Sequence, residues 1–209
     1  QALIDSARYA LYLTVPMLGL ATASLVYSFL QQDFQLRYVY QHSNLAMDRW
    51  LTWVAFYAGN EGSLLYIALS LSVLSALAIH MASNKRGSAI APYVNSVLML
   101  YLSFFLAVIS TLASPFVMLP NVPADGQGIN PLLTHPGMFI HPPIMMTGLV
   151  GVVVPFAFGM GALLSGRTRE WIDLGRTWGL IIWAVLGSGL LLGSWWAYTI
   201  LGGGGYWGW

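Results

Sequence analysis

Five long runs of apolar residues, separated by more polar segments, dominate the chain of 209 residues. A helix needs about 20 mostly apolar residues to cross the hydrocarbon core of a bilayer, and each run approaches or exceeds that length. None of the runs alternates apolar and polar positions as the strands of an outer-membrane barrel do. The runs cover residues 7–30, 63–81, 94–114, 144–164 and 177–200. The pattern therefore predicts an all-α polytopic membrane protein with about five transmembrane helices, and residues 1–209 form a single membrane domain.

The segments between the runs differ in length and in charge. The segments 31–62 and 115–143 are long and fall on one side of the predicted membrane, while the connections on the other side are short. Six of the eight basic residues fall on the side of the short connections, namely Arg8, Lys85, Arg86, Arg167, Arg169 and Arg176. The positive-inside rule makes that side cytoplasmic. We therefore expect an integral protein of a bacterial or organellar inner membrane, with its long loops and its Trp-rich tail on the periplasmic-type face.

The composition supports the membrane class and excludes several others. Hydrophobic residues make up 57% of the chain, and charged residues only 7%, against about 25% charged residues in soluble domains. The net charge of +1 argues against a nucleic-acid partner, which needs a basic face. There is no cysteine, so this chain holds no disulfide, no zinc–thiolate site, no iron–sulfur cluster and no Cys nucleophile. The composition therefore predicts a protein that lies in a lipid bilayer.

The loop 115–143 contains seven prolines, which disfavour a long helix and stiffen the backbone. His141 stands near its end, directly before Pro142 and Pro143. A neutral imidazole held at the boundary between membrane and water is a suitable axial ligand for haem iron. A histidine that only hydrogen-bonds the end of a helix is the alternative, and the spacing alone leaves both interpretations open.

Three further polar residues are weaker candidates for function. His135 lies in the same loop and competes with His141 as a ligand, although a surface histidine is the simpler interpretation. His42, in the first long loop, is equally ambiguous. Glu61 precedes the second apolar run, where a carboxylate stabilises the N-terminus of a helix; steering of a basic partner is the alternative.

The C-terminal end is rich in aromatic residues, which are Trp195, Trp196, Tyr198, Tyr206, Trp207 and Trp209. Trp and Tyr gather at membrane interfaces in any case. An interface belt does not explain the four glycines at 202–205, because such a run is costly in ordering entropy. The glycines indicate a place where a flat ligand approaches the backbone, with aromatic rings beside it. A porphyrin, a quinone or a lipid would fit that description.

An ordered set of motifs runs along most of the chain. The motifs are GNEGSLL at 59–65, SPF with LPN at 114–121, NPLL at 130–133, HPG at 135–137, HPP at 141–143, VPFAFGMGALLSG at 154–166, LGSWWAY at 192–198 and LG-x-GG-Y-W-x-W at 201–209. Together they resemble the CcmF-type cytochrome c haem lyases. Their order and spacing cover roughly residues 33–209. That family belongs to the haem-handling proteins marked by a Trp-rich outer segment, the WWD domain, whose start is matched by residues 195–209. The resemblance implies the N-terminal section of a larger lyase.

The resemblance also implies a cofactor, a reaction and a set of binding residues. Haem of the b type is bound on the outer face, and its vinyl groups are joined to the thiols of a Cys-X-X-Cys-His motif in apocytochrome c. His141 takes the role of an axial ligand to the haem iron. A haem-binding platform is formed by Trp195, Trp196, Tyr206, Trp207 and Trp209. The resemblance identifies no catalytic residue beyond these ligands.

The implied partners are a haem chaperone, apocytochrome c, and other cytochrome c maturation subunits or the remaining part of the lyase. This sequence departs from the family at three positions: Gly203 and Tyr57 stand where Trp is usual, and Asn60 stands where His is common. Two other functions remain open at this point. One is a non-catalytic membrane subunit of a larger complex, and the other is a transporter of haem or quinone.

Overall fold

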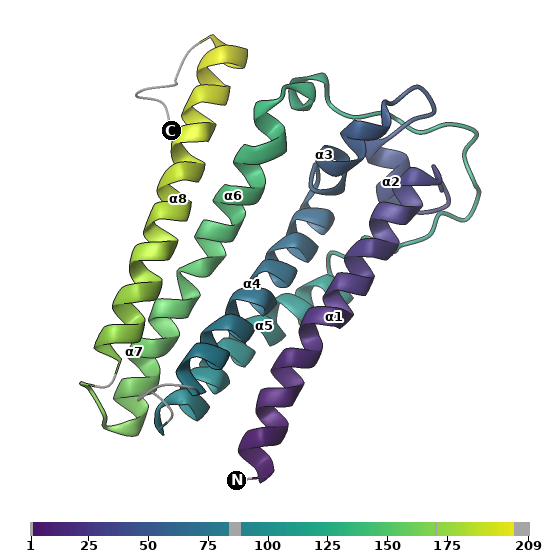
Figure 1. Cartoon of the computed structure of the whole chain (residues 1–209). Coiled ribbons are helices and arrows are strands. Elements are labelled where there is room, and N and C mark those ends of the chain that lie inside the picture. Colours follow the sequence, from purple (N-terminus) through teal and green to yellow (C-terminus); the bar gives the residue numbers. More distant parts are fainter. Residues whose placement is uncertain (1, 84–88, 170, 203–209) are drawn as a thin grey trace.

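The computed structural model describes residues 2–83, 89–169 and 171–202, and most of these residues are helical. The long helices are α1 (Ala2–Leu30), α4 (Asn60–Ser83), α5 (Ala91–Thr111), α6 (Gly137–Gly151), α7 (Val153–Ser165) and α8 (Ile172–Leu201). The short helices are α2 (Arg37–His42), η1 (Arg49–Leu51), α3 (Thr52–Phe56) and η3 (Pro131–Thr134). Figure 1 shows the long helices side by side as a bundle, with the short helices gathered at one end of it.

The structure confirms the all-α class and the five membrane spans. Helices α1, α4, α5 and α8, and the stretch Gly137–Ser165 that joins α6 to α7, are each long and apolar enough to cross a bilayer. The 29 residues of α1 extend over about 43 Å, which exceeds a hydrocarbon core of about 30 Å. Large apolar side chains are exposed along these helices, among them Leu20, Leu100 and Leu191, as helices that face lipid require.

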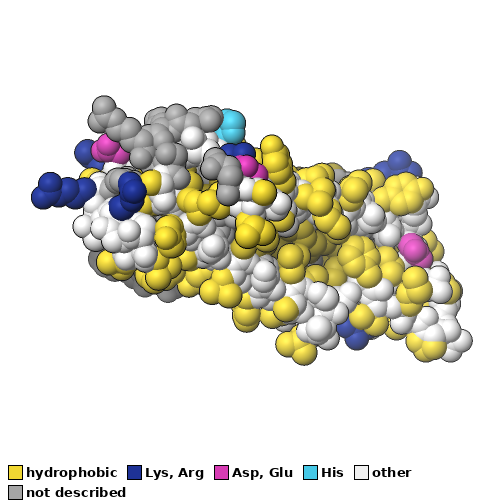
Figure 2. Space-filling model, turned by 90° about the horizontal axis from the view of Figure 1, so that it is seen from below, with side chains coloured by type: hydrophobic (Ala, Val, Ile, Leu, Met, Phe, Trp, Pro, Cys, Tyr) yellow, Lys and Arg dark blue, Asp and Glu magenta, His cyan; other side chains and the backbone are white. Residues whose placement is uncertain are grey.

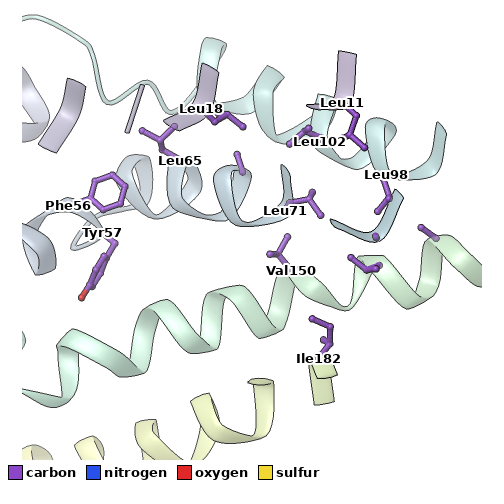
Figure 3. Close-up of a cluster of buried hydrophobic side chains, with 14 of the residues drawn as sticks. Leu11, Leu18, Phe56, Tyr57, Leu65, Leu71, Leu98, Leu102, Val150 and Ile182 are labelled. Atoms are coloured by element: carbon purple, nitrogen blue, oxygen red, sulfur yellow. The ribbon is translucent and has the colours of Figure 1, made fainter. Parts of the chain in front are cut away.

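The core of the bundle is built around α4, which packs against α1, α5 and α6. The core side chains labelled in Figure 3 come from α1, α3, α4, α5, α6 and α8. They include Leu11, Leu18, Phe56, Leu65, Leu71, Leu98, Leu102, Val150 and Ile182, which are all buried. The bundle is thus held by aliphatic packing, which fixes the ends of its helices where the loops begin.

The fourth span consists of two helices that meet at Val152. Pro155 has no backbone N–H, so it cannot bond to the carbonyl of Gly151, which is the partner it would have in a continuous helix. The helix is interrupted at this point, and α7 continues to Gly166, whose φ of 72° is the left-handed conformation typical of a helix end.

The prediction that the second long loop extends to Pro143 is wrong at its end. Helix α6 begins at Gly137, so that His141, Pro142 and Pro143 lie inside its first two turns. Both prolines lie beyond the first turn of α6, so each removes the N–H donor of one helical carbonyl. His141 is therefore a residue of a membrane helix, and it is not a loop residue at the junction.

The two long loops lie at the same end of the bundle, and backbone hydrogen bonds join them into one unit, here termed the outer layer (residues 31–59 and 112–136). Arg37 donates its backbone N–H to the carbonyl of Val117 (2.9 Å), and Leu119 donates to Gln35 (2.8 Å). Farther along, the backbone N–H of Leu45 donates to the carboxylate of Asp125 (2.8 Å). The outer layer is thus an ordered structure that lies over the ends of the spans.

The GNEG motif at 59–62 is explained by close packing around Tyr38. The Tyr38 hydroxyl donates to the carbonyl of Phe56 (3.1 Å) and accepts from the N–H of Gly59 (2.9 Å). A Cβ atom at Gly62 would lie 2.5 Å from that hydroxyl and would clash with the Phe56 carbonyl. Glu61, in the first turn of α4, pairs with Arg37 at 3.7 Å. Glu61 thus has the structural position expected of a carboxylate at a helix N-terminus.

Candidate functional site

His141 is the fifth residue of α6, and its ring contacts α8. Its Nδ1 atom lies 2.9 Å from the carbonyl oxygen of Gly189. A carbonyl only accepts hydrogen bonds, so Nδ1 carries the proton in this contact, and Nε2 of the neutral ring keeps its lone pair. Histidines that ligate metals are commonly oriented in this way, with the other ring nitrogen donating to a carbonyl. The contact therefore leaves Nε2 of His141 with a free lone pair, as a metal ligand requires.

Close approach of α6 and α8 depends on glycine. A Cβ atom at Gly193 would clash with the ring of His141, at 2.9 Å from Nδ1 and 3.0 Å from Nε2. A Cβ atom at Gly189 would lie 2.7 Å from Cα of Met145, in the backbone of α6. Gly189 and Gly193 form a G-x-x-x-G motif, a pattern that lets membrane helices pack at short distance. The sequence analysis missed this motif, although its spacing is visible in the stretch GLLLG.

Two of the predicted aromatic residues flank the histidines of α6 and of the loop before it. The ring of Trp196 lies 6.4 Å from that of His141 and is nearly parallel to it, at 14°. The ring of Trp195 lies 5.3 Å from that of His135. The structure thus brings together His141, Trp195 and Trp196 at the outer end of α6 and α8. The other predicted members, Tyr206, Trp207 and Trp209, lie outside the described residues.

His135 has a different hydrogen-bonding state from His141. Its Nδ1 accepts the backbone N–H of Gly137 at 3.0 Å and so satisfies a free donor at the start of α6. Since Nδ1 must keep its lone pair for this bond, the proton of the neutral ring lies on Nε2. In this state His135 presents an N–H to its surroundings, which cannot ligate a metal. Of the two histidines, the geometry therefore favours His141 as a ligand.

The first turn of α6 is held by side chains of the outer layer. Pro142 and Pro143 leave the carbonyls of Met138 and Phe139 without their helical donors. The hydroxyl of Tyr57 donates to Met138 at 2.6 Å. Trp53 donates through Nε1 to Phe139 at 3.4 Å.

The chemical state of Tyr57 suits this role. Burial raises the pKa of the Tyr57 hydroxyl well above its ordinary value, and the neighbouring Tyr66 adds to the shift. The hydroxyl is therefore protonated at any physiological pH and is available as a donor. Tyr57 thus replaces one of the two hydrogen bonds that the prolines remove, and it helps fix the turn that presents His141.

The remaining histidine candidate, His42, lies in the outer layer. His42 is the last residue of α2; its Nδ1 lies 2.9 Å from the carbonyl of Tyr38, and its ring packs 4.4 Å from the Tyr38 ring.

Within the residues that the structure describes, no three His, Asp or Glu side chains gather as a metal site. A metal held by one imidazole needs its other ligands from elsewhere, which a porphyrin supplies with its four nitrogens. The single oriented imidazole at His141 fits that requirement.

Comparison with known proteins assigns the chain to a family. The family described as cytochrome c assembly protein matches residues 57–209. The cytochrome c-type biogenesis protein CcmF of Pseudomonas fluorescens is 41% identical over 90% of this chain and 29% of that protein. The cytochrome c-type biogenesis protein NrfE of Haemophilus influenzae is 36% identical over 99% of this chain and 32% of that protein. The chain thus spans about a third of the length of the curated relatives it matches.

A solved structure agrees with the sequence comparisons. The chain of a cytochrome c haem lyase CcmF superposes with a TM-score of 0.78 at 32% identity, over 98% of this chain and 32% of that chain. The fold of this chain is therefore similar to part of a protein of known structure. This chain belongs to the cytochrome c assembly protein family and is a cytochrome c biogenesis protein of the CcmF type.

Proposed function

We propose that this chain forms part of the haem-binding site of a cytochrome c haem lyase, on the periplasmic-type face of a bacterial or organellar inner membrane. The observation that carries the proposal is the hydrogen bond between Nδ1 of His141 and the carbonyl of Gly189, which leaves the lone pair of Nε2 for iron. Gly193 lets the His141 ring lie directly against α8, because a Cβ atom at this position would overlap the ring.

Each residue of the site has a distinct task. His141 ligates the iron of b-type haem through Nε2. Trp195 and Trp196 form an apolar aromatic wall beside it, and Tyr206, Trp207 and Trp209 extend that platform. When bound, haem supplies the vinyl carbons to which the two thiols of a Cys-X-X-Cys-His motif add. The chain has no cysteine of its own, which suits a lyase whose reacting thiols belong to its substrate.

The partners follow from this role. A haem chaperone delivers haem to the outer layer, and apocytochrome c presents its thiols there. Any further ligand to the haem iron would come from the remaining part of the lyase, and other cytochrome c maturation subunits would complete the assembly. Within this chain the residues bind and orient the substrate, as is usual where a cofactor group carries the reaction.

The test is the variant His141→Ala in the full-length lyase. We expect loss of bound haem, measured by its absorption spectrum per protein, and loss of covalent haem in a co-expressed Cys-X-X-Cys-His cytochrome. His135→Asn is the matched control, because an Asn side chain can cap the same helix start and the variant leaves His141 in place. Added imidazole should partly restore haem binding to His141→Gly.

Other outcomes would favour another function. A His141→Ala variant with the haem content of the unsubstituted protein would contradict ligation by His141. An unsubstituted lyase that binds no haem would favour a non-catalytic subunit. A lyase that binds haem but forms no thioether with apocytochrome c would favour a transporter.

A further inference from the structure

A cavity of about 510 Å³ lies between α1, α4 and α5 at the end of the bundle opposite the outer layer. This end carries the N-terminus in Figure 1, and Figure 2 looks onto it. The cavity is lined by Asp5 and Arg8 of α1, by Asn95 of α5, and by apolar side chains that include Leu3, Ile4 and Ile79. The haem-binding proposal uses none of these residues.

Two polar atoms of the residues that line this cavity are buried without a hydrogen-bond partner. One is Oδ1 of Asn95, whose side chain belongs to a residue only 5% exposed. The other is Nε of Arg8, although the end of the same guanidinium pairs with Asp5 at 3.0 Å. Leaving buried polar atoms unpaired is unfavourable, and such atoms are rare in native proteins. One atom is an acceptor and needs a donor, while the other is a donor and needs an acceptor.

The N-terminus of α5 adds a positive partial charge to the same cavity. Ala91 and Pro92, the first two residues of this 21-residue helix, line it. The preceding residue, Ile90, provides no side-chain cap, and its carbonyl accepts the N–H groups of Tyr93 and Val94. The dipole of the helix favours a negative group at this end. A phosphate that reaches the guanidinium of Arg8 would therefore also meet the start of α5.

The position of the cavity along the membrane normal agrees with that of a lipid headgroup. Arg8 lies about 33 Å along α1 from Leu30, close to the thickness of the hydrocarbon core. Leu3 is 86% exposed and Ile4 is 51% exposed, so apolar surface is available beside the polar groups. Since Arg8 and Asp5 compensate each other's charge, the cavity suits a zwitterion better than an anion.

We propose that this cavity binds the headgroup of a phosphatidylethanolamine molecule. The phosphate accepts from Arg8 and lies beside the positive end of the α5 dipole, and the ammonium donates to Asn95 and Asp5. The acyl chains lie against Leu3 and Ile4. The site is distinct from the haem site, and its test does not depend on haem.

The experiment measures lipid retention and thermal stability of the purified full-length protein in detergent. The probes are palmitoyl-oleoyl phosphatidylethanolamine and palmitoyl-oleoyl phosphatidylcholine, which have the same phosphate and the same net charge. Only the ethanolamine headgroup has N–H donors. We expect native mass spectrometry to show at least tenfold stronger retention of the ethanolamine lipid, and its addition to raise the melting temperature more.

Variants locate the site. Arg8→Gln and Asn95→Leu should lose the preference for the ethanolamine lipid, while Arg176→Gln, which removes an exposed basic residue at the same end of the bundle, should retain it. Asn95→Leu should be at least as stable as the unsubstituted protein without added lipid, because it removes an unpaired buried acceptor.

Three results would overturn the proposal. The first is equal retention of the two lipids by the unsubstituted protein, and the second is an unchanged preference in Asn95→Leu or Arg8→Gln. The third is displacement of the bound lipid by millimolar inorganic phosphate, which would assign the cavity to a free anion.

Discussion

The hydroxyl of Tyr57 donates a hydrogen bond of 2.6 Å to the carbonyl of Met138, a residue 81 positions later in the chain. Met138 lacks its helical donor because Pro142 has no N–H. The outer layer therefore completes the hydrogen bonding of a membrane helix one turn before the imidazole of His141.

Removing this donor should weaken the start of α6. In Tyr57→Phe the Met138 carbonyl stays buried without a partner, which costs about 1–3 kcal/mol in the free energy of unfolding. Thermal unfolding in detergent measures the change. Tyr40→Phe is the control, because the Tyr40 hydroxyl makes only a long, exposed contact with Gln127 at 3.5 Å. Equal stability of the two variants would contradict the role assigned to Tyr57.

Alkaline pH should destabilise the protein through the same hydroxyl. Burial raises the pKa of Tyr57 above its ordinary value of 10.0, so the folded state retains a proton that the unfolded state releases. Its contribution to stability is therefore complete below pH 10 and declines as the pH rises further, with a slope of up to about 1.4 kcal/mol per pH unit. Unfolding followed between pH 8 and 11 should show a shallower decline in Tyr57→Phe than in the unsubstituted protein. Parallel curves would show that Tyr57 ionises equally in both states.

Gly193→Ala should impair the haem site more than it impairs the fold. The added Cβ atom meets the ring of His141, so the ring must turn away from the Gly189 carbonyl or α8 must move. We expect haem content per protein to fall at least tenfold. Gly187→Ala on the same helix is the matched control, since nothing lies within 4 Å of its added Cβ atom. Alanine there should be neutral or stabilising by up to about 1 kcal/mol. Equal haem content in both variants would contradict the steric argument.

Gly62→Ala should be strongly destabilising where α4 meets the outer layer. Its Cβ atom meets the Phe56 carbonyl and the Tyr38 hydroxyl, both of which are fixed by hydrogen bonds. A loss of about 3 kcal/mol or more is expected, typical of overpacking combined with a broken buried contact. Gly19→Ala in α1 has open space around its Cβ atom and serves as the control. The most direct measurement is limited proteolysis, in which the loop 31–59 should be cleaved faster in Gly62→Ala than in Gly19→Ala.

The sequence predicts the membrane bundle well because the signal is local. Each span is a run of apolar residues whose length alone indicates a crossing, and all five are found. The start of α6 escapes the same reasoning. Seven prolines between 115 and 143 argue against a helix. The donors that replace the hydrogen bonds lost at Pro142 and Pro143 come from Trp53 and Tyr57, more than 80 residues away.

The candidate site was predicted in part. His141 and the two tryptophans at 195 and 196 are recognisable as residue types, and the structure places them together. Which ring nitrogen carries the proton could not be predicted for either histidine, because one backbone contact decides it. His141 contacts the carbonyl of Gly189, and His135 contacts the N–H of Gly137. The G-x-x-x-G spacing of Gly189 and Gly193 is the one sequence signal that could have paired α6 with α8.

The hydrogen bonds from Trp53 and Tyr57 also set where one cooperative unit ends and the next begins. The turn at Gly137–His141 belongs to the helix of a membrane span, yet two of its carbonyls are held by the outer layer. Loss of outer-layer structure would therefore release this turn while the rest of α6 stays packed on α8. We expect the segment that presents the imidazole to open together with the neighbouring loops, so that a protein bound to those loops would alter the imidazole without entering the membrane.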